Sequence, residues 1–198
     1  MGRAWINLTT GDYHGVVAAA RDGTQVTAHH SVAVQLFAQE AEARARMGDR
    51  RQTEVALDKG RTLLDALPCP ENLDHHFVVD PVKFDYYAMD RYRTVGANSM
   101  AGHLAEEVIE ANTDCDGRER APVRMAGAGI TPGVVRAREG DLEQAVSLGM
   151  RALEGDRKSL PSLLMVSRDL TKVLSDRYPG QTQTQDYLDQ LTSLANAG

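Results

Sequence analysis

The chain has 198 residues, enough to bury one core, and its 22 basic and 28 acidic side chains leave a net charge of −6 at pH 7. These charges are spread along the whole length, whereas nucleic-acid binding needs clustered cations, so we expect no direct nucleic-acid binding by this chain. The longest apolar stretches, 31–38 and 160–166, are too short to cross a bilayer, so we expect no membrane span.

The first residues lack the apolar core of a secretory signal, which predicts a cytoplasmic protein. The two cysteines, Cys69 and Cys115, lie far apart, without the spacing of metal ligands or of a disulfide framework. We therefore predict reduced thiols, no bound metal and no cofactor.

Helix-forming residues dominate the long segments, and no run alternates between apolar and polar side chains, so the sequence predicts an all-α fold. A short segment, 2–10, comes first, and a helix over 12–22 follows it. The Ser31 hydroxyl is placed to accept a hydrogen bond from an unpaired amide at the start of the next helix. That helix runs to Met47, and Gly48 ends it.

Proline marks the start of two later helices. Asp80 is a typical N-cap, and Pro81 suits the first helical position because no donor is needed there, which predicts a helix over 81–95. Ser159 and Pro161 repeat this pattern before a helix over 160–177, which ends at the Tyr178-Pro179-Gly180 turn. The remaining helices are predicted at 50–67, 99–111, 122–138, 142–154 and 184–195, and the longest loops at 68–79 and 112–121.

Four glycines lie between predicted helices, where a left-handed residue ends one helix before the next begins. They are Gly11, Gly48, Gly96 and Gly140, and an aspartate that can cap the next helix follows all but Gly96. Their spacing exceeds the roughly 34 residues of an ideal tetratricopeptide unit. The pattern predicts a single domain over 1–198, a tetratricopeptide-like right-handed array of about four helix pairs with C-terminal capping helices. The alternative is an ordinary helical bundle without repeats.

Small side chains follow these turns at positions where a neighbouring helix must approach closely. They are Ala19, Ala20, Ala56, Ala101, Ala105, Ala145 and Ala152. The first pair is short, and exposure of Trp5, Ile6 and Leu8 would leave an apolar patch of the kind that marks an interface, so we expect a homodimer.

Five strings go beyond generic repeat composition. They are GDYHGVV (11–17), VALDKGR (55–61), HHFVVDP (75–81), KFDYYAMD (83–90) and DRKSLPSLLMV (156–166). Together they resemble the C-terminal tetratricopeptide region of the actinobacterial Xre-type transcriptional regulators. That family joins an N-terminal helix-turn-helix to a helical sensing or interaction domain, and the resemblance covers nearly the whole chain.

Two departures from the family limit what the resemblance implies. The sequence opens inside the first repeat, without the helix-turn-helix, so we do not expect this chain to regulate genes directly. In segment 124–135 the family keeps an unbroken helix, whereas here Pro132 removes a helical donor and three glycines loosen the backbone. We therefore predict a kinked or broken helix at Pro132.

In such an array, the first helix of each pair lines a concave groove that holds the ligand. Alignment on the turn glycines predicts a ligand-binding wall composed of Glu42, Arg46, Lys83, Tyr86, Asp90, Arg93, Ile130, Val134 and Arg138. Its three arginines occupy equivalent or adjacent positions, where they would form a positive stripe for a carboxylate or a peptide terminus. The alternative is that they are solvated arginines beside acidic side chains.

A polar cluster precedes and opens the helix over 81–95. If the protein is an enzyme, acid and base groups are expected at His75, His76, Tyr86 and Asp90. Adjacent histidines point apart, so this cluster does not predict a metal site. The sequence contains no nucleophile-elbow, P-loop or zinc-protease motif, so hydrolase and nucleotide-dependent activities have no motif behind them.

These observations favour a ligand- or partner-binding helical module that acts as a sensor or adaptor, with a peptide, protein or small metabolite in its concave groove. One alternative is an enzyme of specialised metabolism that evolved from a regulator fragment and uses a pocket between helices. The other is a structural dimeric scaffold.

Overall fold

All regular elements in the described part of the chain are helices. The computed structural model describes residues 2–27, 30–68, 78–154 and 160–197, and ten helices lie within them. The prediction of an all-α fold is therefore confirmed. Among these residues, no helix combines the length and the apolar character that a membrane crossing requires.

The helices gather in two compact units, Met1–Gly96 and Ala97–Gly198, where the sequence predicted a single domain over 1–198. The boundary falls at the third of the four predicted glycine turns. Each unit has its own helices and is described by itself.

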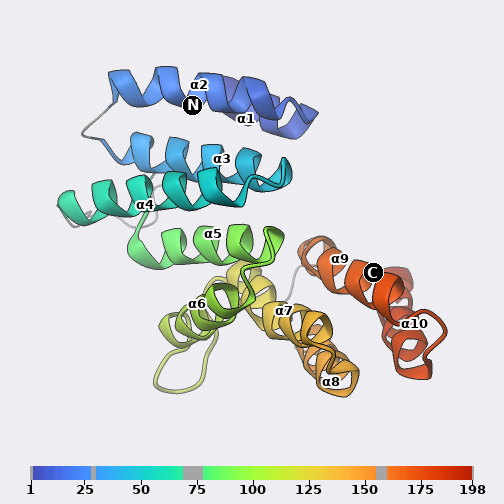
Figure 1. Ribbon diagram of the computed structural model, residues 1–198. Coiled ribbons are helices and arrows are strands. Elements are labelled where there is room, and N and C mark those ends of the chain that lie inside the picture. The colour runs from blue at the N-terminus through green and yellow to red at the C-terminus, as the bar shows by residue number, and fades with distance from the viewer. Residues whose placement is uncertain (1, 28–29, 69–77, 155–159, 198) are drawn as a thin grey trace. The chain divides into compact units, whose positions relative to one another are not determined.

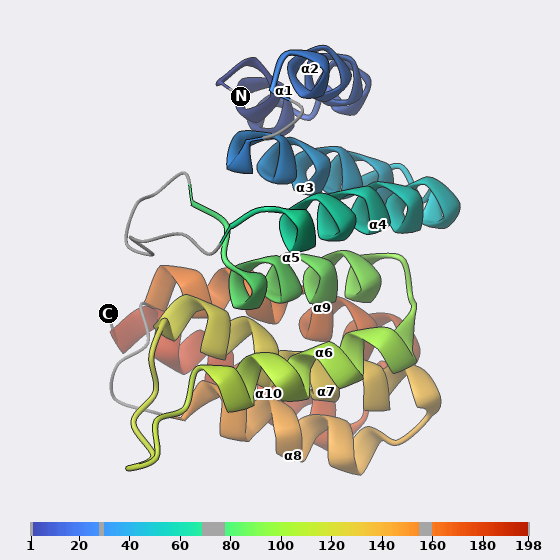
Figure 2. The same ribbon diagram turned by 90° about the vertical axis from the view of Figure 1, so that its left-hand side faces the viewer.

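The first unit is built around one central helix, α3. Its helices are α1 (Gly2–Thr10), α2 (Tyr13–Val26), α3 (Ser31–Arg46), α4 (Arg50–Ala66) and α5 (Pro81–Thr94). Helix α3 packs against each of the other four, and Figures 1 and 2 show α2, α3, α4 and α5 following one another as layers.

The alanine content of α3 explains this central position. Five of its alanines are at most 4% exposed: Ala33, Ala38, Ala41, Ala43 and Ala45. They point in several directions around the helix, and because a methyl group takes little space, neighbouring backbones can approach on more than one side.

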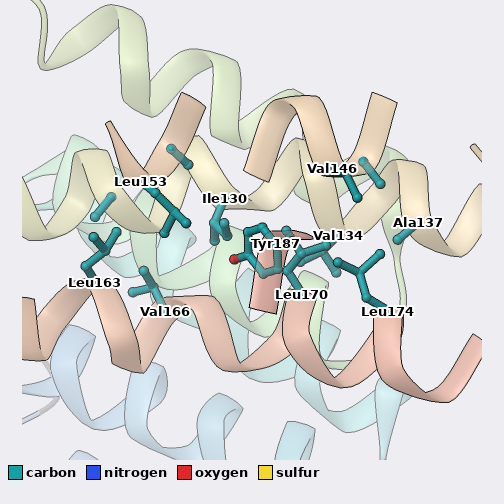
Figure 3. Packing of buried hydrophobic residues seen from close by; sticks show 13 residues of the cluster. Ile130, Val134, Ala137, Val146, Leu153, Leu163, Val166, Leu170, Leu174 and Tyr187 are labelled. Atoms are coloured by element: carbon teal, nitrogen blue, oxygen red, sulfur yellow. The ribbon is translucent and has the colours of Figure 1, made fainter. Parts of the chain in front are cut away.

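The second unit is built in the same way around α7. Its helices are α6 (Asn98–Ala111), α7 (Pro122–Glu139), α8 (Leu142–Leu153), α9 (Leu160–Arg177) and α10 (Thr182–Ala197). Helix α7 packs against α6, α8 and α9, and α10 packs against α8 and α9. Figure 3 shows the core of this unit, in which Ile130 and Val134 of α7 face Leu170 of α9 and the ring of Tyr187 of α10.

Helix α7 is continuous through Pro132, so of the predicted kink or break, the break does not occur. Proline cannot donate a hydrogen bond to the carbonyl one turn earlier, and the glycines lower the helical propensity further. Burial compensates for these costs. Gly127 and Gly133 are buried, and an added Cβ at Gly133 would lie only 3.1 Å from the backbone oxygen of Ala145 in α8. The residues that weaken α7 as an isolated helix therefore allow α8 to approach it.

The four predicted glycine turns are present. Gly11, Gly48, Gly96 and Gly140 have φ values of 79°, 75°, 74° and 101°, in the left-handed region that favours glycine. After three of them, an aspartate carboxylate caps the next helix and accepts from a backbone amide: Asp12 from Gly15, Asp49 from Gln52 and Asp141 from Gln144. Ala97 begins α6 without a side-chain cap.

One helix start differs from the prediction. Helix α3 begins at Ser31, but its N-cap is His30, whose Nδ1 accepts from the Val32 amide at 3.2 Å. The imidazole can replace a hydroxyl because a neutral ring nitrogen carries a free lone pair. Ser159, predicted to start α9, lies outside the described residues.

The predicted packing faces are largely confirmed. Six of the seven small residues after the turns are buried, and Ala19 packs against the core cluster of the first unit. On α1, Trp5 and Ile6 are 57% and 60% exposed, whereas Leu8 packs against that same cluster. The predicted apolar patch therefore consists of Trp5 and Ile6.

Gly149 of α8 lies under two core side chains of the second unit. A Cβ there would lie 2.6 Å from Leu170 Cδ2 and 2.9 Å from Tyr187 Cε2. We predict that Gly149→Ala lowers the free energy of unfolding by about 1–3 kcal/mol, because the core must shift to make room. Urea denaturation followed by circular dichroism measures this change.

The matched control is Gly102→Ala in α6, also in the second unit, where an added Cβ meets nothing within 4 Å. Alanine should raise the free energy of unfolding there by about 0.4–1 kcal/mol, because it restricts the unfolded chain without a clash. Equal effects of the two substitutions would contradict the packing described for Gly149.

Tyr187 is fully buried, and its hydroxyl has no hydrogen-bond partner among the described residues. Burial raises the pKa of this phenol to about 12, against a smaller lowering by the nearby Ser167 hydroxyl. Since neither hydroxyl reaches a partner with hydrogen-bond geometry, burial is the effect that decides the shift.

We predict that Tyr187→Phe leaves the free energy of unfolding at pH 7 unchanged or raises it, because no hydrogen bond is lost. The wild type should lose stability as the pH rises from about 10 to about 12, since the unfolded phenol ionises first, and the variant should lose less. Chemical denaturation between pH 7 and pH 11 measures both effects.

Tyr178→Phe provides the contrast. The Tyr178 hydroxyl donates to the Ala137 carbonyl at 2.7 Å and so ties the end of α9 to α7. Loss of this hydroxyl should lower the free energy of unfolding by about 1 kcal/mol at pH 7. A larger loss for Tyr187→Phe than for Tyr178→Phe would contradict the assignment of the Tyr187 hydroxyl as unpartnered.

Candidate functional site

Helix α5 carries most of the predicted site residues that lie in the first unit, and its start holds it in place. The Asp80 carboxylate accepts from the Lys83 amide at 2.9 Å, and Pro81 occupies the first turn. Phe84, Ala88 and Met89 are buried, which anchors one face of the helix. The polar residues that follow are therefore positioned by a packed helix rather than by a loop.

Five charged side chains from α3 and α5 form a connected network. Glu42 of α3 accepts a hydrogen bond from Arg46 Nε at 2.8 Å, one turn along the same helix. Its other oxygen lies 3.0 Å from Arg91 Nε of α5, an ion pair that lacks the angle of a hydrogen bond. Arg91 Nη1 donates to Asp90 at 2.9 Å, and Arg93 donates to the other Asp90 oxygen. We call these five residues the charge network.

The charge network is mostly removed from water. The side chains of Glu42, Arg93 and Arg91 are 9%, 5% and 13% exposed, whereas that of Arg46 is 51% exposed. Arg46 is therefore the member through which solvent or a ligand reaches the network. Three guanidinium groups face two carboxylates, so one positive charge is in excess among these five side chains.

The arginines decide the protonation of Asp90. Burial by itself would raise the pKa of this carboxyl, but the guanidinium groups of Arg93, Arg91 and Arg46 outweigh burial and lower it. Asp90 therefore stays ionised at neutral pH. Burial would likewise lower the pKa of Arg91, but Glu42 and Asp90 outweigh it and raise that pKa.

Two tyrosines of α5 border the charge network. Burial, followed by the negative charge of Asp90, raises the pKa of Tyr86, so its phenol remains protonated and able to donate. The guanidinium carbon of Arg91 lies 5.3 Å from the ring centre of Tyr87, a cation–π contact. Tyr86 and Tyr87 lie with their ring centres 6.2 Å apart.

The structure brings together part of the predicted wall. Glu42, Arg46, Asp90 and Arg93 belong to the charge network, and the Asp90 charge affects the ionisation of Tyr86. Lys83 belongs to the same helix, but its Nζ donates to the Val78 carbonyl at 2.8 Å. The ammonium therefore fixes the segment that enters α5.

The other three predicted wall residues belong to the second unit. Ile130 and Val134 are fully buried in its hydrophobic core, where they pack against other side chains and offer no surface to a ligand. Arg138 donates to the Asn98 side chain at 3.4 Å. The positive stripe described by the structure therefore comprises Arg46 and Arg93 of the first unit, joined by Arg91.

The acid–base group predicted for an enzyme is only partly described. His75 and His76 lie outside the described residues. Tyr86 and Asp90 are described, and the shifts of their pKa values, upward for Tyr86 and downward for Asp90, move both away from neutrality. Within the described ranges, no group of three or more His, Cys, Asp or Glu side chains is arranged to hold a metal ion.

Neither Arg91 nor the link between α4 and α5 was predicted from the sequence. Arg61 of α4 forms an ion pair with Asp85 of α5, and its guanidinium carbon lies 4.9 Å from the ring centre of Phe84. Arg91 contacts Glu42 only because α5 packs on α3. No local pattern in the sequence signals such contacts, since the ion-pair partners are 24 or more residues apart.

No protein-family model matches the chain, and comparisons with curated proteins and with solved structures found no significant match.

We predict that Asp90→Asn costs about 3 kcal/mol of unfolding free energy at pH 7, because the guanidinium of Arg93 would stay buried without its carboxylate. The folded pKa of Asp90 lies below its unfolded value of 3.8. Its stabilising contribution is therefore present above about pH 4 and is lost as the pH falls through the folded pKa. The difference between wild type and variant should shrink on acidification from pH 7 to pH 2.5, measured by urea denaturation.

Asp22→Asn in α2 is the control, because Asp22 is an exposed carboxylate of the same unit. Its effect should stay within about 0.5 kcal/mol at every pH. A wild-type advantage over Asp90→Asn that is constant with pH would show that Asp90 is not held ionised by the arginines.

Proposed function

We propose that this chain is a ligand- or partner-binding helical module whose charge network takes a carboxylate of a peptide, a protein or a small metabolite. The observation that carries the proposal is the half-exposed guanidinium of Arg46, through which solvent reaches a network of three arginines. A carboxylate bound at Arg46 would accept paired hydrogen bonds from its guanidinium.

The rest of the charge network and its border favour an anion as the ligand. Tyr86, which lies near Asp90, keeps its phenol protonated, so it is a donor and not a competing negative charge. The carboxylate of Asp90 is already engaged by Arg91 and Arg93, so it would not bind a cationic ligand without releasing them.

As the finer description of the fold, we propose a tetratricopeptide-like right-handed array of about four helix pairs, with α9 and α10 as the capping helices. Short turns with left-handed glycines join α1 to α2, α3 to α4 and α7 to α8, which supports the helix pair as the repeated unit. The Xre-type resemblance supports the same reading, and with it a sensor or adaptor role.

Self-association through α1 is a second candidate function. Trp5 and Ile6 are consecutive residues of α1, and both side chains are more than half exposed. Neighbouring large apolar side chains usually avoid water, so their joint exposure indicates a surface that a second chain could cover. The enzyme alternative has no comparable observation, because the two described acid–base candidates, Tyr86 and Asp90, titrate away from neutral pH.

The test is a thermal-shift screen of the full chain against metabolite carboxylates and against tetrapeptides with free or amidated C-termini, followed by calorimetry on the hits. Free carboxylates should bind and their amides should not. We predict that Arg46→Ala weakens the binding of a hit by about 10- to 100-fold, the loss expected for a hydrogen bond to a charged group.

Arg50→Ala is the matched control. Arg50 is 58% exposed and pairs with Glu54 four residues later, so it mirrors the exposure and helical spacing of the Arg46–Glu42 pair outside the charge network. Its loss should change the affinity by less than about two-fold. Equal binding of acids and amides, or equal effects of the two substitutions, would refute the proposed function.

A further inference from the structure

The first unit contains a groove that does not involve the charge network. Its volume is about 510 Å³, within the usual range of ligand sites. Helices α2 and α4 form its walls, and α3 forms its floor. The groove exists because α2 and α4 both pack on α3 and, among the described residues, not on each other.

The groove has an extended shape that follows from helical spacing. On α4 it is lined by Gln52, Val55, Ala56 and Lys59, which lie on one face over two helical turns. Two turns correspond to about 10 Å along the helix axis. It is partly open to solvent rather than fully enclosed.

The groove is lined by both apolar and amide side chains. Phe37 on the floor and Val55 on one wall offer an apolar surface, and Val55 is 38% exposed. Gln25 on α2 and Gln52 on α4 stand on opposite walls, and each amide can both donate and accept. Such side chains suit the backbone of a peptide, which also presents a donor and an acceptor at each residue.

Positive charge predominates in the groove, although the whole chain carries −6. The floor carboxylate of Glu40 lies 3.6 Å from Arg44, which is only 16% exposed, and 3.7 Å from Arg21. Arg44 also lies 4.0 Å from Asp49, so Arg44 and Arg21 share Glu40. An incoming anion would compete with Glu40 for Arg21 on one wall and meet Lys59 on the other. Both wall cations are exposed.

The two wall cations lie at different levels of the groove. Arg21 on α2 lies at the level of Glu40, to which it is paired. Lys59 on α4 precedes Gly60, where an added Cβ would lie 3.2 Å from Phe37 Cβ, so Lys59 lies at the level of Phe37. Phe37 and Glu40 are three residues apart on α3, so the cations stand on opposite walls about one helical turn apart.

We propose that this groove binds an acidic peptide segment of a partner protein, in which carboxylates flank an aliphatic side chain. The carboxylates pair with Arg21 and Lys59, the aliphatic side chain rests on Phe37 and Val55, and the two glutamine amides bond to the peptide backbone. The open, two-turn shape fits a chain that enters and leaves, which distinguishes this occupant from an enclosed metabolite. The site shares no residue with the charge network, so it goes beyond the function proposed above.

The experiment uses the full chain and three fluorescein-labelled 12-residue peptides, followed by fluorescence anisotropy at 50 and 300 mM NaCl. The first carries Glu-Leu-Glu at its centre, the second Lys-Leu-Lys and the third Glu-Ser-Glu. The first should bind most tightly, the third at least five-fold more weakly, and the second not measurably. Binding of the first should weaken at high salt, because exposed charges are screened.

Two charge reversals on α4 locate the site. Lys59→Glu lies in the groove, whereas Arg51→Glu lies outside it on the same helix, and both positions are exposed. Both substitutions change the net charge of the chain by the same amount. A difference in affinity between the two variants therefore reports direct contact with the peptide and not general electrostatic attraction. Lys59→Glu should weaken the Glu-Leu-Glu peptide at least ten-fold, and Arg51→Glu less than two-fold, with circular dichroism confirming that both variants are folded.

Changes in the NMR chemical shifts of the backbone amides of the isotope-labelled chain, on addition of the unlabelled peptide, then report where the peptide lies. Shifts confined to α2, α4 and residues 36–40 support the proposal. Shifts at Arg46 and α5, equal weakening by both charge reversals, or no binding of the Glu-Leu-Glu peptide at 1 mM would overturn it. The Arg46→Ala variant should bind this peptide normally, so failure here and failure of the carboxylate site are distinguishable.

Discussion

The close approach of neighbouring helices to α3 and α7 is the constraint on which the rest of the structure depends. Each lies at the centre of its unit and contacts three or more other helices, which bulky side chains on every face would prevent. Alanines meet this constraint in α3, and glycines with alanines meet it in α7. The price is low intrinsic helicity in α7, where buried contacts with α8 and α9 replace the lost propensity.

A central helix with small residues also determines where polar groups are found. Because α5 packs against α3, the two acidic and three basic side chains of the charge network are brought into contact and largely out of water. Such a network stabilises the fold only while every charge keeps its partner. The same arrangement leaves one guanidinium at the surface, so the interaction that joins the helices also creates the candidate carboxylate site.

Different faces of α3 carry the two proposed sites. Glu42 and Arg46 contribute to the charge network, whereas Phe37 and Glu40 form the floor of the groove between α2 and α4. Both sites present exposed basic side chains on a chain that is acidic overall. Anionic partners would therefore be attracted to particular places and not to the whole surface, which favours specificity over general affinity.

The sequence by itself determined the helical class, the four glycine turns, the aspartate caps and the buried small residues, because each depends on groups only a few residues apart. The predicted cap at Ser31 was wrong, because His30 caps α3 instead, and the break foreseen at Pro132 is absent, because burial keeps α7 continuous. Only the tertiary structure decided that Arg91 meets Glu42, that Ile130 and Val134 belong to a core, and that a groove opens over Phe37. These outcomes depend on which helix faces pack together, and an amphipathic pattern specifies that a face is buried without specifying its partner.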